Sequence, residues 1–150
     1  MKDLLISDFT NSCFQKRFKL YFDELGVNVK DWDELFNELN DEKDNRAYVR
    51  FTDTDDVIGF ILFKPIALSN WFFNLKLGLI REFWVSKKYR GMGNGKSLLH
   101  LAETYFKENG LHKSILTTDT APKFYEKNGY IKDSTIIAKN EDDVFVKELK

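Results

Sequence analysis

One short segment of this 150-residue chain restricts its fold more than any other: a glycine-rich loop between a strand-like run and a helix-like run. Gly91, Gly93 and Gly95 fall within five residues. Glycine lets the backbone approach a ligand closely and lets successive N–H groups point the same way. The loop leads directly into the N-terminus of a predicted helix, where unpaired N–H groups and the helix dipole favour negative charge. The segment therefore predicts an anion-binding turn.

The charge around this loop favours the same interpretation, because no Asp or Glu lies between Glu82 and Glu103. Four basic residues lie in that window: Lys87, Lys88, Arg90 and Lys96. A tight turn with solvated lysines is the simpler alternative. The glycine spacing of this loop does not match that of two familiar phosphate-binding motifs. The first glycine of a P-loop would have to stand at Arg90, and the last glycine of a dinucleotide-binding fingerprint at Lys96.

Apolar periodicity predicts two helices before the loop and two after it. The first carries an apolar face from Phe14 to Leu25, and the second begins at a capping box of Asp31 and Glu34. The third follows the loop and ends at Asn109-Gly110. The fourth is short, with Asp119 or Thr120 as its N-cap, Pro122 in its first turn and Gly129 at its end.

Strand-like runs alternate with these helices. They cover residues 47–52 and 57–63 as a hairpin, 77–86, 112–117, and a closing hairpin of 130–138 with 144–149. In the 77–86 strand we expect the odd-numbered face, with Leu77, Leu79, Phe83 and Val85, to face the core. Two strands joined by one helical crossover should pair in parallel. The sum is an α+β domain with a mostly antiparallel sheet and one parallel step.

The spacing that does fit the loop is R-x-x-G-x-G, carried by Arg90, Gly93 and Gly95. A second motif, A-x-x-F-Y-x-x-x-G-[FY], runs from Ala121 to Tyr130, one helix and one strand further on. With both motifs in order, the chain resembles the GNAT superfamily of acyl-CoA-dependent N-acetyltransferases over about residues 77–149. The resemblance implies a single GNAT-like N-acetyltransferase domain over residues 1–150, in which one pair of parallel strands splays apart and helices flank the sheet.

The resemblance also implies a site for acetyl-CoA, whose pyrophosphate the loop would hold and whose pantetheine arm would enter between the parallel strands. The expected binding residues are Phe83, Trp84, Val85, Arg90, Gly91, Met92, Gly93, Asn94, Gly95, Lys96, Ser97, Thr118 and Tyr125. Tyr125 would protonate the leaving thiolate, and Glu82 is the candidate general base for the amine. A buried core tyrosine and an exposed strand glutamate are the structural alternatives. The family often has Asn, which binds pantetheine, where this chain has Thr118-Asp119-Thr120, so the chain departs from the family pattern at that contact.

Composition limits the other possibilities. A net charge of −1 argues against a general nucleic-acid binder. The longest apolar run is far shorter than the roughly 20 residues that span a bilayer, and Cys13 is the only cysteine. We therefore expect a cytoplasmic protein with no membrane partner. Neither His100 nor His112 has neighbours at metal-ligand spacing, so no metal is expected.

Two sequence features concern the acceptor and the partner. Residues 1–56 contain 14 acidic and 8 basic residues, a net charge of −6, which would suit a cationic amine of a small molecule or peptide. Trp71-Phe72-Phe73 could line a pocket, form a contact in a homodimer, or pack in the core. Two other functions compete with acetyl transfer. One is a non-catalytic acyl-CoA-binding sensor or scaffold, and the other is a nucleotide-binding protein.

Overall fold

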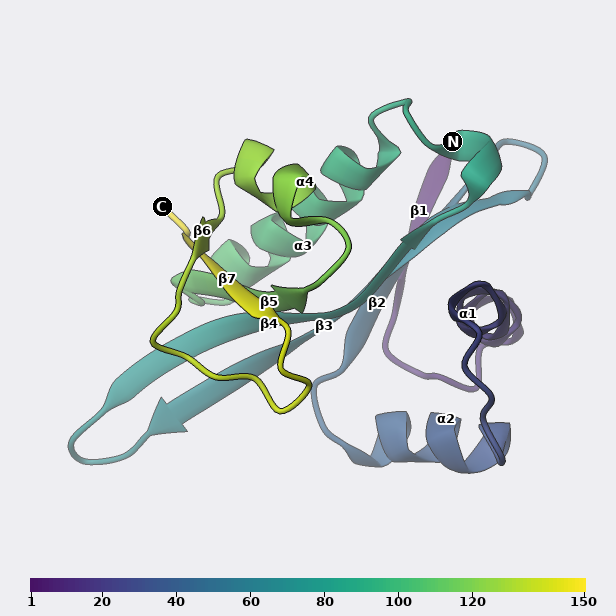
Figure 1. Ribbon diagram of the computed structural model, residues 1–150. Coiled ribbons are helices and arrows are strands. Elements are labelled where there is room, and N and C mark those ends of the chain that lie inside the picture. The colour runs from purple at the N-terminus through teal and green to yellow at the C-terminus, as the bar shows by residue number, and fades with distance from the viewer. The chain divides into compact units, whose positions relative to one another are not determined.

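The computed structural model describes residues 1–150 and contains seven strands, four α-helices and one 3-10 turn. Their bounds are β1 Lys2–Ile6, α1 Ser12–Leu25, α2 Trp32–Asp41, β2 Arg46–Phe51, β3 Val57–Ser69, β4 Asn74–Val85, η1 Lys87–Tyr89, α3 Asn94–Glu108, β5 Lys113–Thr118, α4 Pro122–Lys127, β6 Ile131–Lys132 and β7 Asp143–Glu148. The strands follow the order β1-β2-β3-β4-β5-β7-β6, and β4 and β5 pair in parallel (Figure 1). The expected α+β fold with a mixed sheet is confirmed.

The chain forms two compact units, which we describe separately. Unit 1 comprises Met1–Phe63 and Glu82–Leu99, and unit 2 comprises Lys64–Arg81 and His100–Lys150. The glycine loop belongs to unit 1, and the second sequence motif belongs to unit 2. No helix is long and apolar enough to cross a membrane.

Unit 1 is built around a cluster of aromatic rings between its helices and strands β1–β3. The Phe14 ring lies 5.0 Å from Phe9, 5.1 Å from Phe18 and 5.6 Å from Phe60. Figure 1 shows α1 and α2 beside β1–β3, and their buried faces belong to one core cluster with these strands. Partly buried Cys13 packs against this cluster. The periodicity of the first two helices is thus explained by packing.

The ends of these helices match their predicted capping residues. The Asp31 carboxylate accepts the N–H of Glu34 at 3.0 Å, and Gly26 ends α1 with φ of +71°. Asn11, which the sequence analysis missed, caps the start of α1 by accepting the N–H of Phe14 at 3.0 Å. Strand β1 was missed as well, because it is an edge strand with only Ile6 buried.

The expected core face of β4 is wrong. Ile80 and Trp84, on the even-numbered face, are buried, whereas Phe83 on the odd-numbered face is half-buried. The Trp84 ring lies 6.0 Å from the buried Phe60 ring, and its indole N–H has a carboxylate acceptor in Glu24 at 3.1 Å. A large ring whose polar N–H is satisfied is well suited to burial, which the apolar count of the odd face did not reveal.

Unit 2 contains the parallel step, in which Leu77–Leu79 of β4 pair with Lys113–Ile115 of β5. Gly78 lies directly against the Phe106 ring of α3, so a side chain at this position would overlap the ring. Strand β7 pairs antiparallel with β5 along its whole length. The parallel pairing of β4 with β5 ends at Ile115, although β5 itself continues to Thr118.

Two details of unit 2 differ from expectation. The closing hairpin is asymmetric: β6 covers only Ile131–Lys132, because Asp133 accepts the backbone N–H of Thr135 at 2.9 Å and turns the chain away from the strand. The N-cap of α4 is Ala121, not Asp119 or Thr120, and the Thr118 hydroxyl accepts the Ala121 N–H at 3.1 Å. Pro122 occupies the first turn as expected.

Candidate active site

The glycine loop of unit 1 forms a backbone surface at the start of α3. Gly91 and Gly93 have φ of +75° and +82°, the left-handed region that only glycine adopts at little cost. A Cβ built at either residue would meet no atom within 4 Å. The first N–H groups of α3, from Asn94 to Lys96, lack acceptors within the helix, as in every α-helix. The loop therefore offers several backbone donors beside open space, which suits a diphosphate.

The side chain of Arg90 does not point into this space but holds the loop to the rest of unit 1. Its Nε donates to the carbonyl oxygen of Val85 at 2.7 Å, and its Nη2 donates to Glu24 at 2.9 Å. Burial acts to raise the pKa of the Glu24 carboxyl, but the hydrogen bonds from Arg90 and Trp84 outweigh it and hold that pKa below its usual value. Arg90 thus fixes the loop, and the backbone is left to bind.

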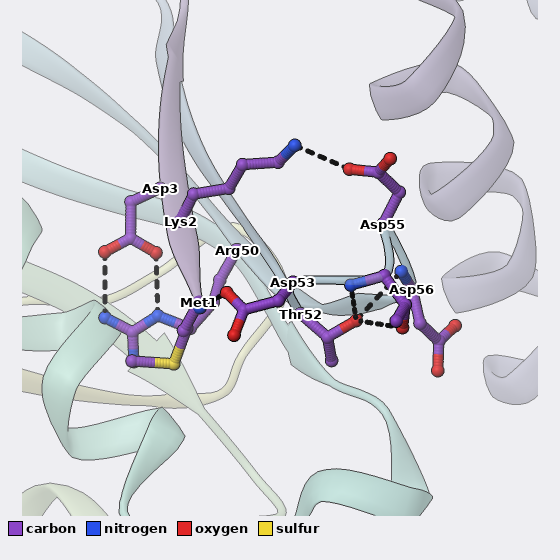
Figure 2. Close-up of polar contacts among 9 residues, drawn as sticks. Met1, Lys2, Asp3, Arg50, Thr52, Asp53, Asp55 and Asp56 are labelled. Carbon is purple, nitrogen blue, oxygen red and sulfur yellow. Dashed lines mark hydrogen bonds and ion pairs between the residues drawn. The ribbon is translucent and has the colours of Figure 1, made fainter.

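A buried arginine braces the other side of the loop. Arg50 of β2 pairs with both carboxylate oxygens of Asp3 at 2.7 and 3.0 Å, as Figure 2 shows. The same guanidinium donates to Ser97 Oγ at 2.8 Å and to Asn94 Oδ1 at 3.3 Å. Asn94 in turn donates to the carbonyl oxygen of Tyr89 at 3.1 Å. The network ties the first turn of α3 to β1 and β2.

A third brace holds the 3-10 turn before the glycines. The Tyr89 hydroxyl donates to Asp56 at 2.6 Å, and the Lys88 amine lies 3.6 Å from the same carboxylate. The hydrogen bond raises the pKa of the Tyr89 phenol and lowers that of the Asp56 carboxyl. Asp56 follows the Thr52–Asp55 turn that Figure 2 shows, so the β2–β3 turn contacts the loop through this residue.

The remaining predicted binding residues of unit 1 differ in exposure. Met92 and Lys96 are exposed, Gly95 and Ser97 are half-buried, and Asn94 is buried. The N–H of Ser97 donates to the carbonyl oxygen of Gly93 at 3.0 Å, so both its N–H and its hydroxyl take part in holding the helix start. Phe83 and Val85 lie half-buried on β4, on either side of buried Trp84.

The candidate base Glu82 also lies in unit 1, near the end of β4. The Tyr21 hydroxyl of α1 donates to Glu82 Oε2 at 2.5 Å, and both side chains are half-buried. A short hydrogen bond to a carboxylate is among the stronger neutral–charged contacts in proteins. Glu82 is therefore held in a defined orientation by α1. This arrangement differs from that of a solvated surface glutamate.

The candidate acid Tyr125 and the predicted binding residue Thr118 lie in unit 2. Tyr125 is buried on α4, with its ring 5.2 Å from Phe124 and 5.7 Å from Tyr130, both edge-on. Thr118 is buried at the end of β5, where its hydroxyl shapes the turn into α4. Thr118 thus ends the parallel strand β5, and Tyr125 of the second motif follows on α4, the next helix of the chain.

A buried polar network fixes the segment that carries Tyr125. The Tyr130 hydroxyl hydrogen-bonds with Glu103 and Ser114, each at 2.8 Å, and the Lys147 amine donates to Glu103 at 3.0 Å. Burial, with the charge of Glu103, raises the pKa of the Tyr130 phenol above its ordinary value. The aromatic residue that ends the second motif is therefore an anchor that joins α3, β5 and β7 within unit 2.

Sequence reasoning missed the residues that position the loop and Glu82: Asp3, Tyr21, Glu24, Arg50 and Asp56. They come from β1, α1, β2 and the β2–β3 turn, far from the motif in the sequence. Only the single arginine in the otherwise apolar 47–51 run gave a signal, since a charged residue in a buried strand needs a partner. Across residues 1–150 no three His, Cys, Asp or Glu side chains form a group that could hold a metal.

Comparison with known proteins gives the family. The model of the acetyltransferase (GNAT) family matches residues 4–130. The chain belongs to the GNAT acetyltransferase family. The matched span includes both GNAT motifs and parts of both units. No curated protein matches the sequence.

Solved structures of other GNAT-like proteins share the fold. A GNAT-family acetyltransferase of Staphylococcus aureus Mu50 superposes with a TM-score of 0.70 at 18% identity, with 99% of this chain and 100% of that chain covered. A ribosomal-protein-alanine N-acetyltransferase of Brucella melitensis biovar Abortus 2308 gives 0.72 at 18% identity, covering 92% and 98%. The PaiA N-acetyltransferase of Thermoplasma acidophilum, in complex with coenzyme A, gives 0.65 at 20% identity, covering 99% of each chain.

Proposed function

We propose that this GNAT chain transfers an acetyl group from acetyl-CoA to the amine of a small molecule or peptide, by direct attack of the amine on the thioester. The observation that carries the proposal is the loop backbone, in which two left-handed glycines face open space at the start of α3. The T. acidophilum neighbour was solved with coenzyme A, which supports the same ligand class. The loop matches the spacing of neither the P-loop nor the dinucleotide-binding fingerprint, so these two motifs give no support to a nucleotide as the ligand.

In this proposal the backbone N–H groups from Gly91 to Lys96 hold the pyrophosphate, and the exposed Lys96 adds positive charge. The side chains of Arg90 and Asn94 keep the loop in shape through the contacts described above. Phe83, Trp84 and Val85 provide strand backbone for the pantetheine arm, and Thr118 would contribute from β5. Acetyl-CoA supplies the electrophile, a thioester carbonyl.

Two residues of the chain would move protons. The amine nitrogen forms a bond to the carbonyl carbon while the carbon–sulfur bond breaks, and the sulfur leaves as a thiolate. A phenol with a pKa near 10 is protonated at pH 7, so the Tyr125 hydroxyl can give its proton to that sulfur. An alkylamine is neutral in only about one molecule in a thousand to ten thousand at pH 7. Glu82, oriented by Tyr21, would accept the proton that the ammonium must lose.

The acceptor is proposed to be a cationic amine. The first 56 residues carry a net charge of −6, from 14 acidic and 8 basic residues, and they include the helix that presents Tyr21 and Glu24. A negative surface raises the local concentration of cations and speeds their association. A cytoplasmic location, where acetyl-CoA is available, is part of this proposal.

A matched pair of glycine variants tests the observation that carries the proposal. In Gly93→Ala a Cβ would enter the open space of the loop, and a left-handed residue would become strained. Gly110, at the end of α3, has φ of +74° and equally open surroundings, so Gly110→Ala has a similar strain. Both variants should lose similar stability, but only Gly93→Ala should lose coenzyme A affinity, measured by calorimetry. Equal affinities would show that the loop does not bind the cofactor.

The enzymatic step is tested with Tyr125→Phe. Thermal shift with coenzyme A, acetyl-CoA, ATP and NAD identifies the ligand first, since a ligand at 100 times its dissociation constant stabilises the fold by about 2.7 kcal/mol. Tyr125→Phe should bind acetyl-CoA normally and acetylate amines far more slowly, by mass-spectrometric assay. Equal turnover would remove Tyr125 from the mechanism. Binding without turnover of any amine by the wild type would favour a sensor or scaffold, and protection by ATP alone would favour a nucleotide-binding protein.

A further inference from the structure

The hairpin that joins β3 to β4 in unit 2 exposes a group of large apolar side chains. Trp71, Phe72 and Phe73 are 99%, 87% and 58% exposed, and Ile66, Leu68 and Leu75 are each about half exposed. Core packing of the Trp71-Phe72-Phe73 segment, one of the sequence-based possibilities, is therefore wrong. Figure 1 shows the loop of this hairpin projecting beyond β5, β7 and α4 of the same unit.

The turn at the end of the hairpin is well defined by hydrogen bonds. The N–H of Asn70 donates to the carbonyl oxygen of Phe73 at 2.9 Å. The Asn70 side chain accepts the N–H groups of Phe72 and Phe73 at 2.7 and 2.9 Å. Trp71 and Phe72 thus lie in a turn whose geometry is fixed by Asn70. Their exposure is a consequence of that turn.

This pairing also sorts the hairpin side chains onto two faces. With Asn70 opposite Phe73, antiparallel geometry places Leu68 opposite Leu75, and alternation places Ile66 on the same face. The other face carries Ala67, Ser69, Asn74 and Lys76. One face is therefore mostly apolar, and we call it the apolar hairpin face: Ile66, Leu68, Phe73 and Leu75, continued by Trp71 and Phe72 in the turn. Asn70, opposite Phe73, is its polar residue, and its side-chain oxygen is occupied by the N–H groups of the turn.

Neighbouring strands do not extend along this part of the hairpin. The register of β2 on β3 ends at Phe63, and the register of β5 on β4 begins at Leu77. Pro65 lies in β3 and has no N–H to offer to a ladder. A long exposed apolar hairpin promotes association unless it is covered.

We propose that a second copy of this chain covers the apolar hairpin face, so that the protein is a homodimer with a twofold axis near Leu68 and Leu75. The three rings expose roughly 500 Å², and the aliphatic side chains raise the apolar area to about 600–700 Å². A standard interface uses about 800 Å² from each partner. The hairpin thus supplies most of the area that a stable dimer needs, and homodimer interfaces are more apolar than non-obligate interfaces.

Charge favours a second copy over an anionic membrane as the occupant. Segment 64–76 contains only two charged residues, Lys64 and Lys76. Recognition of anionic lipid uses clusters of about 4–8 basic residues. Lys76 lies on the face opposite to the apolar one, and Lys64 lies at the base of the hairpin. Self-pairing about the twofold axis would keep the two copies of Lys64 at opposite ends of the interface, so little like-charge repulsion opposes it.

The test is the mass of the full chain in solution, by sedimentation equilibrium over a wide concentration range. The wild type should have twice the 17.7 kDa mass of the chain. Leu75→Lys, at a side chain that is already half exposed, should raise the dimer dissociation constant by at least about a hundredfold. Asn74→Lys adds the same charge on the other face of the same strand and should remain dimeric. Trp71 fluorescence should shift to the blue as the wild type associates, and this change should be absent in Trp71→Phe.

Each alternative outcome contradicts the proposal. A wild type that stays monomeric at every concentration excludes it, and co-sedimentation of that monomer with phosphatidylcholine–phosphatidylserine vesicles would identify a membrane surface instead. A dimer that Leu75→Lys leaves intact would place the interface elsewhere on the chain. Because coenzyme A binding can be measured on the same samples, failure of this inference is distinguishable from failure of the proposed acetyl transfer.

Discussion

Replacing Arg50 by methionine tests whether the buried network positions the loop. Arg50 is 3% exposed and contacts Asp3, Asn94 and Ser97 through one guanidinium group. Methionine preserves the unbranched apolar stem but removes all four hydrogen bonds. The variant leaves the Asp3 carboxylate without its charge partner. Arg50→Met should therefore affect both the stability of unit 1 and the shape of the loop.

The magnitude follows from burial. Breaking one partner of a buried ion pair costs about 3–5 kcal/mol, because the other charge remains desolvated. The Asp3 side chain is 26% exposed and can regain some hydration, so the lower end of this range applies. A loss of about 3 kcal/mol lowers the melting temperature by roughly 6–12 °C in a chain of this size. Differential scanning calorimetry measures this directly.

Two further variants assign the loss to its cause. Arg46 lies on the same strand but is half-exposed, and its guanidinium donates to the adjacent carbonyl oxygen of Asn45 at 2.8 Å. Arg46→Met should therefore lower the melting temperature by no more than a few degrees. Adding Asp3→Asn to Arg50→Met removes the orphaned charge and should restore part of the stability. The double variant should not restore the position of the loop, because the hydrogen bonds from Arg50 to Asn94 and Ser97 are still absent.

Coenzyme A affinity separates positioning from general stability. Arg50→Met and the double variant should both bind coenzyme A about tenfold more weakly at a temperature where they are fully folded, which corresponds to about 1.4 kcal/mol. Arg46→Met should bind normally. If Arg50→Met melts within 2–3 °C of the wild type, or keeps full affinity when folded, then the network does not hold the loop and the reasoning fails.

Three other predictions concern single contacts. Tyr21→Phe removes the hydrogen bond that orients Glu82 and should lower kcat about tenfold without changing coenzyme A affinity, whereas an unchanged kcat would exclude Glu82 as an oriented base. The Glu24 carboxyl has a lowered pKa in the folded state, so its stabilising effect is present above its ordinary pKa of 4.5 and is lost as the pH falls through the folded-state pKa. In urea titrations the stability difference between the wild type and Glu24→Gln should therefore shrink on acidification. A difference that is independent of pH would contradict the assignment. Gly78→Ala forces a Cβ into the Phe106 ring and should lower the free energy of unfolding in urea by about 1–3 kcal/mol. Adding Phe106→Leu should recover part of this loss. An unchanged free energy of unfolding in Gly78→Ala would show that the ring can move aside.

The parts of the fold that sequence reasoning found are those governed by local rules. The glycine loop, the helix after it and the end of α1 at Gly26 each depend on residues within a few positions of one another. Backbone conformation at a left-handed glycine or a capping aspartate is decided by that residue and its neighbours. Such features could be predicted without knowing what packs against them.

The errors occur where distant residues decide the outcome. The buried face of β4 is set by Phe60 and Glu24, which contact Trp84 but lie 24 and 60 residues away in the sequence. Edge strand β1 has little periodicity because only one face of it is partly covered. Strand β6 is short because a local turn of Asp133 and Thr135 forms in place of the strand. Alternation of apolar and polar residues does not show which of the two will form.

The same distinction applies to the candidate site. The motifs identified the backbone that would bind coenzyme A, but they did not identify the side chains that hold this backbone, because Arg50, Glu24 and Asp56 lie far before both motifs in the sequence. This arrangement has a functional consequence. If α1 contributes to the acceptor side through Tyr21 and Glu82, as proposed, then the same helix also stabilises the donor loop through Glu24 and Arg90. A change that displaces α1 as a whole should therefore alter both the orientation of Glu82 and coenzyme A affinity, since the two sets of contacts lie one helical turn apart. Tyr21→Phe removes only one of these contacts and leaves the one between Glu24 and Arg90 in place.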